Sequence, residues 1–150
     1  MSFISGASPP QQRADDPGDL ARFFRGICYL RPHGWKDLKK AVQQALSDVK
    51  VSTCWVVKAE VLIGARDDAA FARLSDNLRV IPEVPVTAEV WATAARLGYA
   101  LRRQGFMVPL PDLLIAQVAI EGGLVLWHAD KHFEQIRHFS SLQARNFLPE

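Results

Sequence analysis

Apolar residues recur at helical spacing along most of the chain between residues 35 and 104. This spacing predicts four helices, which cover 35–49, 54 to about 64–68, 68–78 and 87 to about 104. Thr87 is a helix-capping residue type, and the apolar residues from Val90 to Leu101 form one stripe along the last of these helices. Short apolar segments between the helices predict strands at 50–53 and 79–82.

The carboxyl-terminal third predicts a helix, a strand and a helix in that order. Pro111 is typical of a first helical turn, and two glycines, Gly122 and Gly123, end the helix that it opens. The apolar segment 124–127 predicts a buried strand, and 131–139 predicts a terminal helix. Short strands that alternate with helices are typical of an α/β sandwich around a parallel sheet, because right-handed crossovers place helices on both faces.

Composition and charge narrow the class of protein without naming its function. The 150 residues are 49% hydrophobic and 23% charged, which suffices for a buried core and excludes a wholly disordered chain. Residues 1–18 lack apolar periodicity, so we expect an irregular or mobile segment there and a single domain over 19–150. A net charge of +2 does not by itself indicate a nucleic-acid partner.

The two cysteines form no CxxC pair, so neither a zinc-thiolate site nor a disulfide scaffold is expected. No apolar run reaches the roughly 18 residues of a membrane span, and residues 1–12 lack the features of a secretory signal. We therefore expect a protein of the cytoplasm.

Three carboxylates occupy positions where the pattern predicts other residue types. Glu60 lies about 160° from Lys58 around its predicted helix, which turns Glu60 inward. Asp112 follows Pro111 at a predicted helix start, and Asp130 follows the predicted strand 124–127. Each has a structural alternative, since Glu60 can reach water from the helix edge and the two aspartates can cap helices.

Together the three acids predict one site, because helix starts and strand ends converge on the same crevice in α/β folds. Buried carboxylates in a group require a cation, and hard oxygen ligands suit Mg²⁺ or Mn²⁺. Such a cation binds phosphate oxygens, so phosphodiester hydrolysis is the predicted chemistry. A zinc site at His128 and His132 is an alternative, although these residues are expected to lie in a strand end and a helix and HExxH is absent. We expect them, with His138, to lie behind the metal ligands or at the surface.

Arg96, Tyr99 and Arg103 lie off the apolar stripe of the predicted helix 87–104. This basic edge can bind a phosphate backbone, and Arg96 and Arg103 are the RNA-binding candidates; a solvated helix face is the alternative. The chain lacks GxGxxG, P-loop and GxSxG motifs, which excludes the dinucleotide, nucleotide and serine-hydrolase sites built on them.

The segments VKAEVLIGAR, ALRRQGFMVPLPDLLIAQVAIEGG and LVLWHADKHFEQI resemble the PIN-domain ribonucleases of the VapC toxin type. The resemblance covers about Val51 to Ile136, and the spacing of Glu60, Asp112 and Asp130, 52 and then 18 residues, agrees with the second, third and fourth acids of that family. It implies a three-layer α/β/α sandwich, a homodimer, and Mg²⁺-dependent cleavage of RNA that a cognate antitoxin inhibits. Glu60, Asp112 and Asp130 would then be metal ligands and catalytic residues, with a metal-bound water as the nucleophile.

The amino terminus departs from the family pattern, in which an apolar strand runs into an Asp followed by Thr or Ser. Aligning ARFFRG on the helix that usually follows places Asp16 at the first acid, but Pro17 and Gly18 stand where Thr or Ser is expected. Two further hypotheses therefore remain open. One is a catalytically impaired member that binds RNA or an antitoxin without cleavage, and the other is an interaction module that uses its arginine face.

Overall fold

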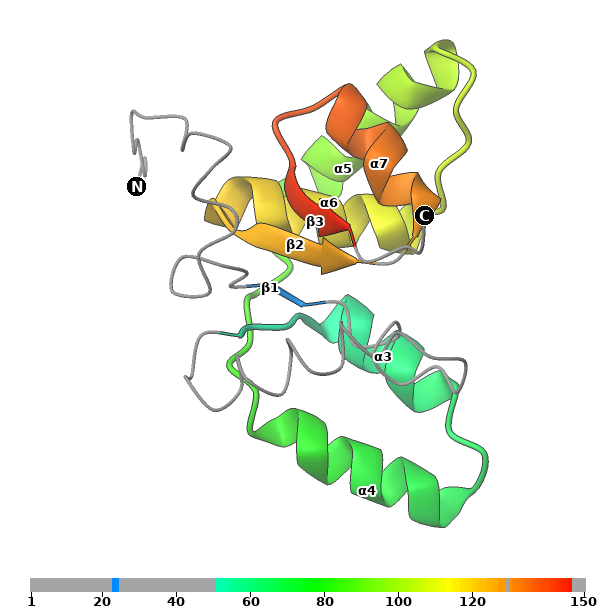
Figure 1. Ribbon diagram of the computed structural model, residues 1–150, viewed down its shortest axis with the longest axis vertical. Coiled ribbons are helices and arrows are strands. Elements are labelled where there is room, and N and C mark those ends of the chain that lie inside the picture. The colour runs from blue at the N-terminus through cyan, green and yellow to red at the C-terminus, as the bar shows by residue number, and fades with distance from the viewer. Residues whose placement is uncertain (1–22, 25–50, 129, 147–150) are drawn as a thin grey trace.

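The computed structural model describes residues 23–24, 51–128 and 130–146. The predicted segment 1–18, with Asp16, and the predicted helix 35–49 lie outside the described residues. The elements, in chain order, are β1 (Phe23–Phe24), α3 (Trp55–Ile63), α4 (Asp68–Arg79), α5 (Ala88–Arg103), α6 (Leu110–Gly122), β2 (Val125–His128), α7 (Lys131–His138) and β3 (Gln143–Asn146). Figure 1 shows their arrangement. None of these helices has the length and hydropathy that a membrane span requires.

The described strands form a parallel sheet in the order β1-β2-β3. β2 pairs with β3 from Val125 opposite Gln143 to His128 opposite Asn146, and β1 pairs with β2 with Phe24 opposite Trp127. In Figure 1, α5, α6 and α7 lie around β2 and β3, whereas α3 and α4 lie beyond β1, and α3 also contacts α6. A parallel sheet between helices confirms the predicted fold class.

Helix α6 is central to the core because it is buried around its whole circumference. Residues 112–119 are all buried, as expected for a helix that is apolar on every face. Gly98 of α5 allows the two helices to pack closely, since a Cβ atom there would lie 2.6 Å from Leu113 Cδ1. Gly123 ends α6 in the left-handed conformation, at φ +61°, which favours glycine.

The predicted helices between 54 and 139 are confirmed, with their ends shifted by a few residues. The Thr87 hydroxyl accepts a hydrogen bond from the Val90 N–H at 3.3 Å, so the predicted cap of α5 is present. Helix α4 has its own cap, because Asp67 Oδ1 accepts from the Ala70 N–H at 2.7 Å. The caps explain why these two helix starts were predictable from local sequence.

The predicted strand at 79–82 is wrong. Arg79 is the last residue of α4, and the following turn leaves Val80 exposed while Ile81 is buried. A β-bridge forms instead at Glu83, the residue after the predicted strand, which pairs in parallel with Thr53. Of the strand predicted at 50–53, both Ser52 and Thr53 are in β-bridges, and Lys50 lies outside the described residues. A single apolar residue after a helix, Ile81, thus packs into the core without continuing as a strand.

The three strands of the sheet each differ from what the sequence predicts. The strand predicted at 124–127 is β2, one residue later, because the Leu124 N–H still bonds to Ala119 O at the end of α6. β3 was not predicted, since its sequence QARN lacks apolar alternation. β1 falls within ARFFRG, which the alignment had assigned to a helix, so the alignment that selected Asp16 is wrong at Phe23–Phe24.

Candidate metal centre

Asp112 lies in the first turn of α6, after the helix begins at Leu110 beyond Pro109. Its side chain is 4% exposed, so the carboxyl group is almost fully withdrawn from water. The positive end of the helix dipole favours a negative charge there, but the cap of α6 is Pro109, so Asp112 is not the capping residue that the structural alternative predicts. Burial of a carboxylate at this depth still requires a strong polar partner.

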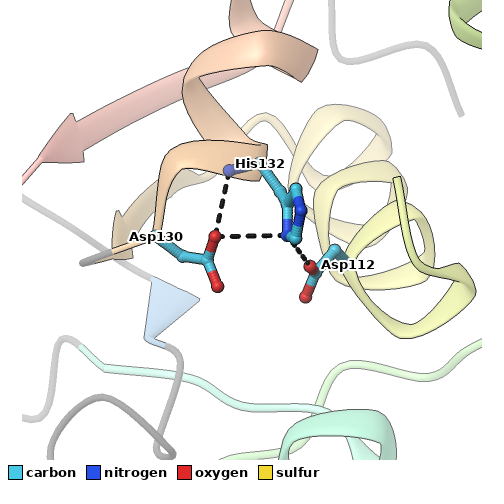
Figure 2. A group of neighbouring side chains, drawn as sticks. All are labelled: Asp112, Asp130 and His132. Atoms are coloured by element: carbon cyan, nitrogen blue, oxygen red, sulfur yellow. Dashed lines mark hydrogen bonds and ion pairs between the residues drawn. The ribbon is translucent and has the colours of Figure 1, made fainter. Parts of the chain in front are cut away.

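His132 provides such a partner, whereas the sequence pattern predicts it behind the metal ligands or at the surface. His132 Nδ1 lies 2.9 Å from Asp112 Oδ2 and 3.2 Å from Asp130 Oδ1. Figure 2 shows the imidazole between the two carboxylates, with each ion pair drawn. One ring nitrogen therefore joins two acids that are 18 residues apart in the sequence.

Asp130 follows the carboxyl end of β2 and is the cap of α7. Its Oδ1 atom accepts a hydrogen bond from the His132 N–H at 3.0 Å, so the predicted capping role is confirmed. Capping and metal binding are compatible, because a carboxylate has two oxygens and several lone pairs. The strand end and the helix start thus bring Asp130 to Asp112, as the sequence argument expected of this type of fold.

One ligand atom from each of Asp112, Asp130 and His132 lies within 4.8 Å of the other two. Two carboxylates at this separation repel each other unless a positive group or a shared proton lies between them. Two carboxylate oxygens and one imidazole nitrogen are all usable ligands for a divalent cation. The donor set therefore fits a metal ion.

His128 supports Asp130 from the interior. The Asp130 N–H donates to His128 Nδ1 at 3.3 Å, and His128 Nε2 lies 3.0 Å from Glu134 Oε1. Because an amide N–H can only donate, Nδ1 is the acceptor and Nε2 carries the hydrogen. Burial lowers the pKa of His128, against the opposing effect of Glu134, and favours this neutral ring. Both nitrogens are engaged, so His128 and His132 do not form the alternative zinc pair.

Glu60 lies on α3, outside the group of Asp112, Asp130 and His132. It is half-buried rather than turned into the core, and the buried residues of α3 include Lys58. The prediction that Glu60 faces the core and Lys58 faces solvent is therefore wrong, because α3 is rotated about its axis relative to that prediction. Lys58 can be buried because its Nζ atom lies 2.7 Å from Glu83 Oε2, and Glu83 is held near by the Thr53 bridge.

Arg96 and Arg103 are both exposed on α5, and neither forms an ion pair with the part of the chain that the structure describes. Tyr99 on the same helix is 67% exposed. This geometry agrees with a face open to a phosphate backbone and equally with a solvated face, so their role in RNA binding stays a prediction.

The sequence pattern did not place His132 among the metal ligands, although a local signal for its position was present. Its signal was available in the order Asp-Lys-His at a strand-to-helix junction, since a capping aspartate receives the backbone N–H two residues later. That bond brings residue 132 beside Asp130. The contact with Asp112 depends on how α7 packs near α6, which the local sequence does not specify.

The family model described as PIN domain matches residues 29–138. Among curated proteins, Ribonuclease VapC11 of Mycobacterium tuberculosis is 32% identical over 110 residues, which is 71% of this chain and 82% of the relative. Ribonuclease VapC18 of the same species is 28% identical over 96 residues, 61% of this chain and 70% of the relative.

Solved structures agree on the fold. VapBC2 from Rickettsia felis, bound to a DNA fragment from its promoter, matches 83% of this chain and 97% of its own with a TM-score of 0.63 and 19% identity. VapBC-5 from Mycobacterium tuberculosis, a member of the VapBC family of toxin–antitoxin systems, matches 64% of this chain and 81% of its own with a TM-score of 0.53 and 25% identity.

Proposed function

The chain belongs to the PIN domain family, among its VapC-type members, and from that premise we propose that it is a metal-dependent endoribonuclease, the toxin of a toxin–antitoxin pair. The ribonuclease names of its relatives support the substrate class. The single structural observation behind the proposal is the convergence of Asp112 and Asp130 within 4.8 Å, together with an imidazole nitrogen.

In this proposal Asp112 and Asp130 bind the cation, Mg²⁺ or Mn²⁺, through carboxylate oxygens. Their positions are well suited to this role, since one belongs to a buried helix and the other caps a helix that follows the sheet. Glu60 is proposed as a further ligand, whereas the strand at Phe23–Phe24 removes the alignment on which Asp16 was chosen. When bound, the cation supplies positive charge that stabilises the phosphate oxygens during phosphodiester hydrolysis.

Four further residues are proposed to bind the substrate or to support the metal site. Arg96 and Arg103 are the proposed contacts to the RNA backbone, where exposed guanidinium groups form charge-assisted hydrogen bonds with phosphates. His128 keeps Asp130 in place through the Asp130 N–H, and it is itself oriented by Glu134. These two residues need not touch RNA to matter for cleavage.

The proposed protein partner is a cognate antitoxin. The VapBC-5 structure supports this partner, because it is a member of a toxin–antitoxin family and resembles this chain in fold. A homodimer and a cytoplasmic location follow from the family resemblance and are proposed with it. Co-expression with candidate antitoxins, followed by co-purification and size measurement, tests both the partner and the assembly.

Cleavage of a mixed panel of structured RNAs tests the enzymatic proposal. We expect cleavage with Mg²⁺ or Mn²⁺, none with EDTA, and loss of cleavage in Asp112→Asn. Asp76→Asn is the matched control, because it makes the same acid-to-amide change at an exposed position of α4. Cleavage that persists in EDTA or in folded Asp112→Asn would contradict a metal held by Asp112.

Metal-linked stabilisation separates an active enzyme from an impaired family member. A cation that binds only the folded protein raises its unfolding temperature as its concentration rises. We expect this increase for the unaltered protein and for Asp76→Asn, and a much smaller one for Asp112→Asn. Folded protein that shows no increase with either cation would favour the impaired alternative.

A further inference from the structure

The ring nitrogen of His132 lies where the two carboxylates of the proposed metal site meet. Nδ1 is 2.9 Å from Asp112 Oδ2 and 3.2 Å from Asp130 Oδ1, and all three side chains point toward one another (Figure 2). The His132 and Asp130 side chains are 25% and 23% exposed, whereas Asp112 is 4% exposed, so His132 and Asp130 lie on the more accessible side of the group. A cation entering this group meets the imidazole together with the acids.

The backbone holds His132 in this position. His132 is in the first turn of α7, and its N–H donates to the capping carboxylate of Asp130. The same two residues are therefore joined both through the main chain and through the ring. A side chain with one end fixed in this way loses little further freedom when it binds a metal ion.

We propose that His132 is a ligand of the metal through Nδ1, and that this nitrogen favours Mn²⁺ over Mg²⁺; the inference rests on the proposed function. Donor atoms at right angles on an octahedral cation with bonds of about 2.1 Å are about 3.0 Å apart. The separations of Nδ1 from the two carboxylate oxygens, 2.9 and 3.2 Å, are close to this value. In the metal-binding tautomer the ring hydrogen lies on Nε2, so Nδ1 offers its lone pair to the cation with little rearrangement of these atoms.

The nitrogen changes which cation the site prefers. Mg²⁺ is a hard ion that takes oxygen ligands, whereas imidazole nitrogen suits transition metals better. A site of acids alone offers Mg²⁺ and Mn²⁺ the same oxygen donors. With His132 included, Mn²⁺ gains a ligand that Mg²⁺ uses poorly, so the ratio of the two dissociation constants increases.

Pulsed electron paramagnetic resonance of bound Mn²⁺ tests the ligand directly, without any measurement of cleavage. A nitrogen bound to Mn²⁺ modulates the electron spin echo at frequencies of the ¹⁴N nucleus. We expect this modulation in the unaltered protein and its loss in His132→Asn, which places an amide oxygen near the position of Nδ1. His138→Asn is the matched control, because His138 is exposed at the other end of the same helix.

Dissociation constants for Mn²⁺, and for Mg²⁺ by competition, provide the second measurement. We expect the Mg²⁺-to-Mn²⁺ ratio to fall about tenfold in His132→Asn and to stay unchanged in His138→Asn. Circular dichroism checks that both variants fold. Protein labelled with ¹⁵N-histidine needs no substitution, and its echo must lose the ¹⁴N modulation if a histidine is the ligand.

The outcomes separate failure of the His132 proposal from failure of the proposed metal site itself. If Mn²⁺ binding depends on Asp112 but the echo shows no modulation by a histidine nitrogen, His132 is not a ligand and the proposed metal site remains intact. Modulation that persists in folded His132→Asn has the same consequence. Mn²⁺ binding that is unchanged in folded Asp112→Asn overturns the proposed site and the His132 ligand together.

Discussion

Asp112 and Asp130 belong to a buried part of the molecule, whereas Glu60 belongs to a pair of helices with a partly apolar surface. The first region contains α6, β2 and α7, in which residues 112–119 are buried without interruption. The second contains α3 and α4, which pack on each other below the sheet in Figure 1 and expose Ile63 and Phe71. Both regions hold acids of the predicted site.

The difference concerns how each acid is fixed. Helix packing, the sheet and a helix cap determine where Asp112 and Asp130 lie. Glu60 depends on the placement of α3, whose orientation involves the ion pair of Lys58 and Glu83. Buried carboxylates on rigid elements make a preformed site, and an acid on a more exposed helix completes it only if that helix is held in place.

The largest expected effect comes from Asp130, in the buried region. Asp130→Asn removes a charged metal ligand but keeps the helix cap, because Asn caps as well as Asp. We expect cleavage and Mn²⁺ affinity to fall about a hundredfold or more, with unfolding free energy unchanged. RNA cleavage assays, metal titration and urea denaturation measure the three quantities.

Asp130→Ala separates the two roles of this residue. It removes the ligand and the cap, so it should match Asp130→Asn in cleavage and be about 1 kcal/mol less stable. Equal stability of the two variants would show that the bond to the His132 N–H does not stabilise α7.

The second prediction concerns the ion pair between Lys58 of α3 and Glu83, in the region of α3 and α4. Glu83→Gln leaves the buried Lys58 ammonium without its carboxylate and should destabilise the fold by about 2 kcal/mol, less than for a fully buried pair because Glu83 is 38% exposed. Lys58→Met removes the charge and keeps the volume, so we expect a change within about 1 kcal/mol. Denaturant unfolding of both variants is the measurement, and a milder effect of Glu83→Gln than of Lys58→Met would contradict the explanation.

The third prediction tests whether the two regions differ in local stability. In hydrogen-exchange measurements, the amides of α4 should have a lower free energy of opening than those of α6. The reason is that α4 has only two buried residues, Ala70 and Leu78. Asp67→Ala removes the cap of α4 and should lower this opening energy by about 1 kcal/mol. Equal protection of α4 and α6 in the unaltered protein would remove the contrast between the regions.

The smallest effect is expected at Cys54, which precedes α3 and is fully buried. Burial raises the pKa of its thiol above 9.0, and nearby Glu60 and Glu83 act in the same direction. The folded chain therefore keeps this proton in a pH range where the unfolded chain loses it. The resulting stabilisation is complete below pH 9.0 and is lost as the pH rises through the folded-state pKa.

Two measurements check this prediction. The stability difference between the unaltered protein and Cys54→Ala should shrink as the pH increases from 8 to 10. Alkylation of Cys54, followed by peptide mass spectrometry, should be much slower in folded protein than in urea. Fast alkylation at pH 8 in folded protein would contradict a buried thiol.

Local sequence predicted the helices better than the strands. Helices α4 and α5 have capping residues and apolar stripes, and both signals lie within the segments themselves. β3 has no such signal, because its pairing with β2 stabilises an otherwise polar segment. The segment 79–82 shows the opposite error, since Ile81 packs against the core from a turn while Val80 is exposed.

The candidate site was also predictable only in part. Asp112 and Asp130 were expected to meet, because a helix start and a strand end converge in a parallel α/β fold, and the structure brings them together. The orientation of Glu60 was wrong, since helical periodicity assigned the charged Lys58 to solvent. A distant partner, Glu83, made burial of that lysine possible.

The sequence by itself determined the alternation of helices and strands, the helix caps and the two acids at element ends, because these depend on neighbours within a few residues. Only the tertiary structure decided that His132 joins Asp112, that Lys58 turns inward and that a polar segment pairs as β3. Each of these depends on a contact with a residue 18 to 25 positions away. Such contacts form only when the chain packs, and the pattern of any single segment does not contain them.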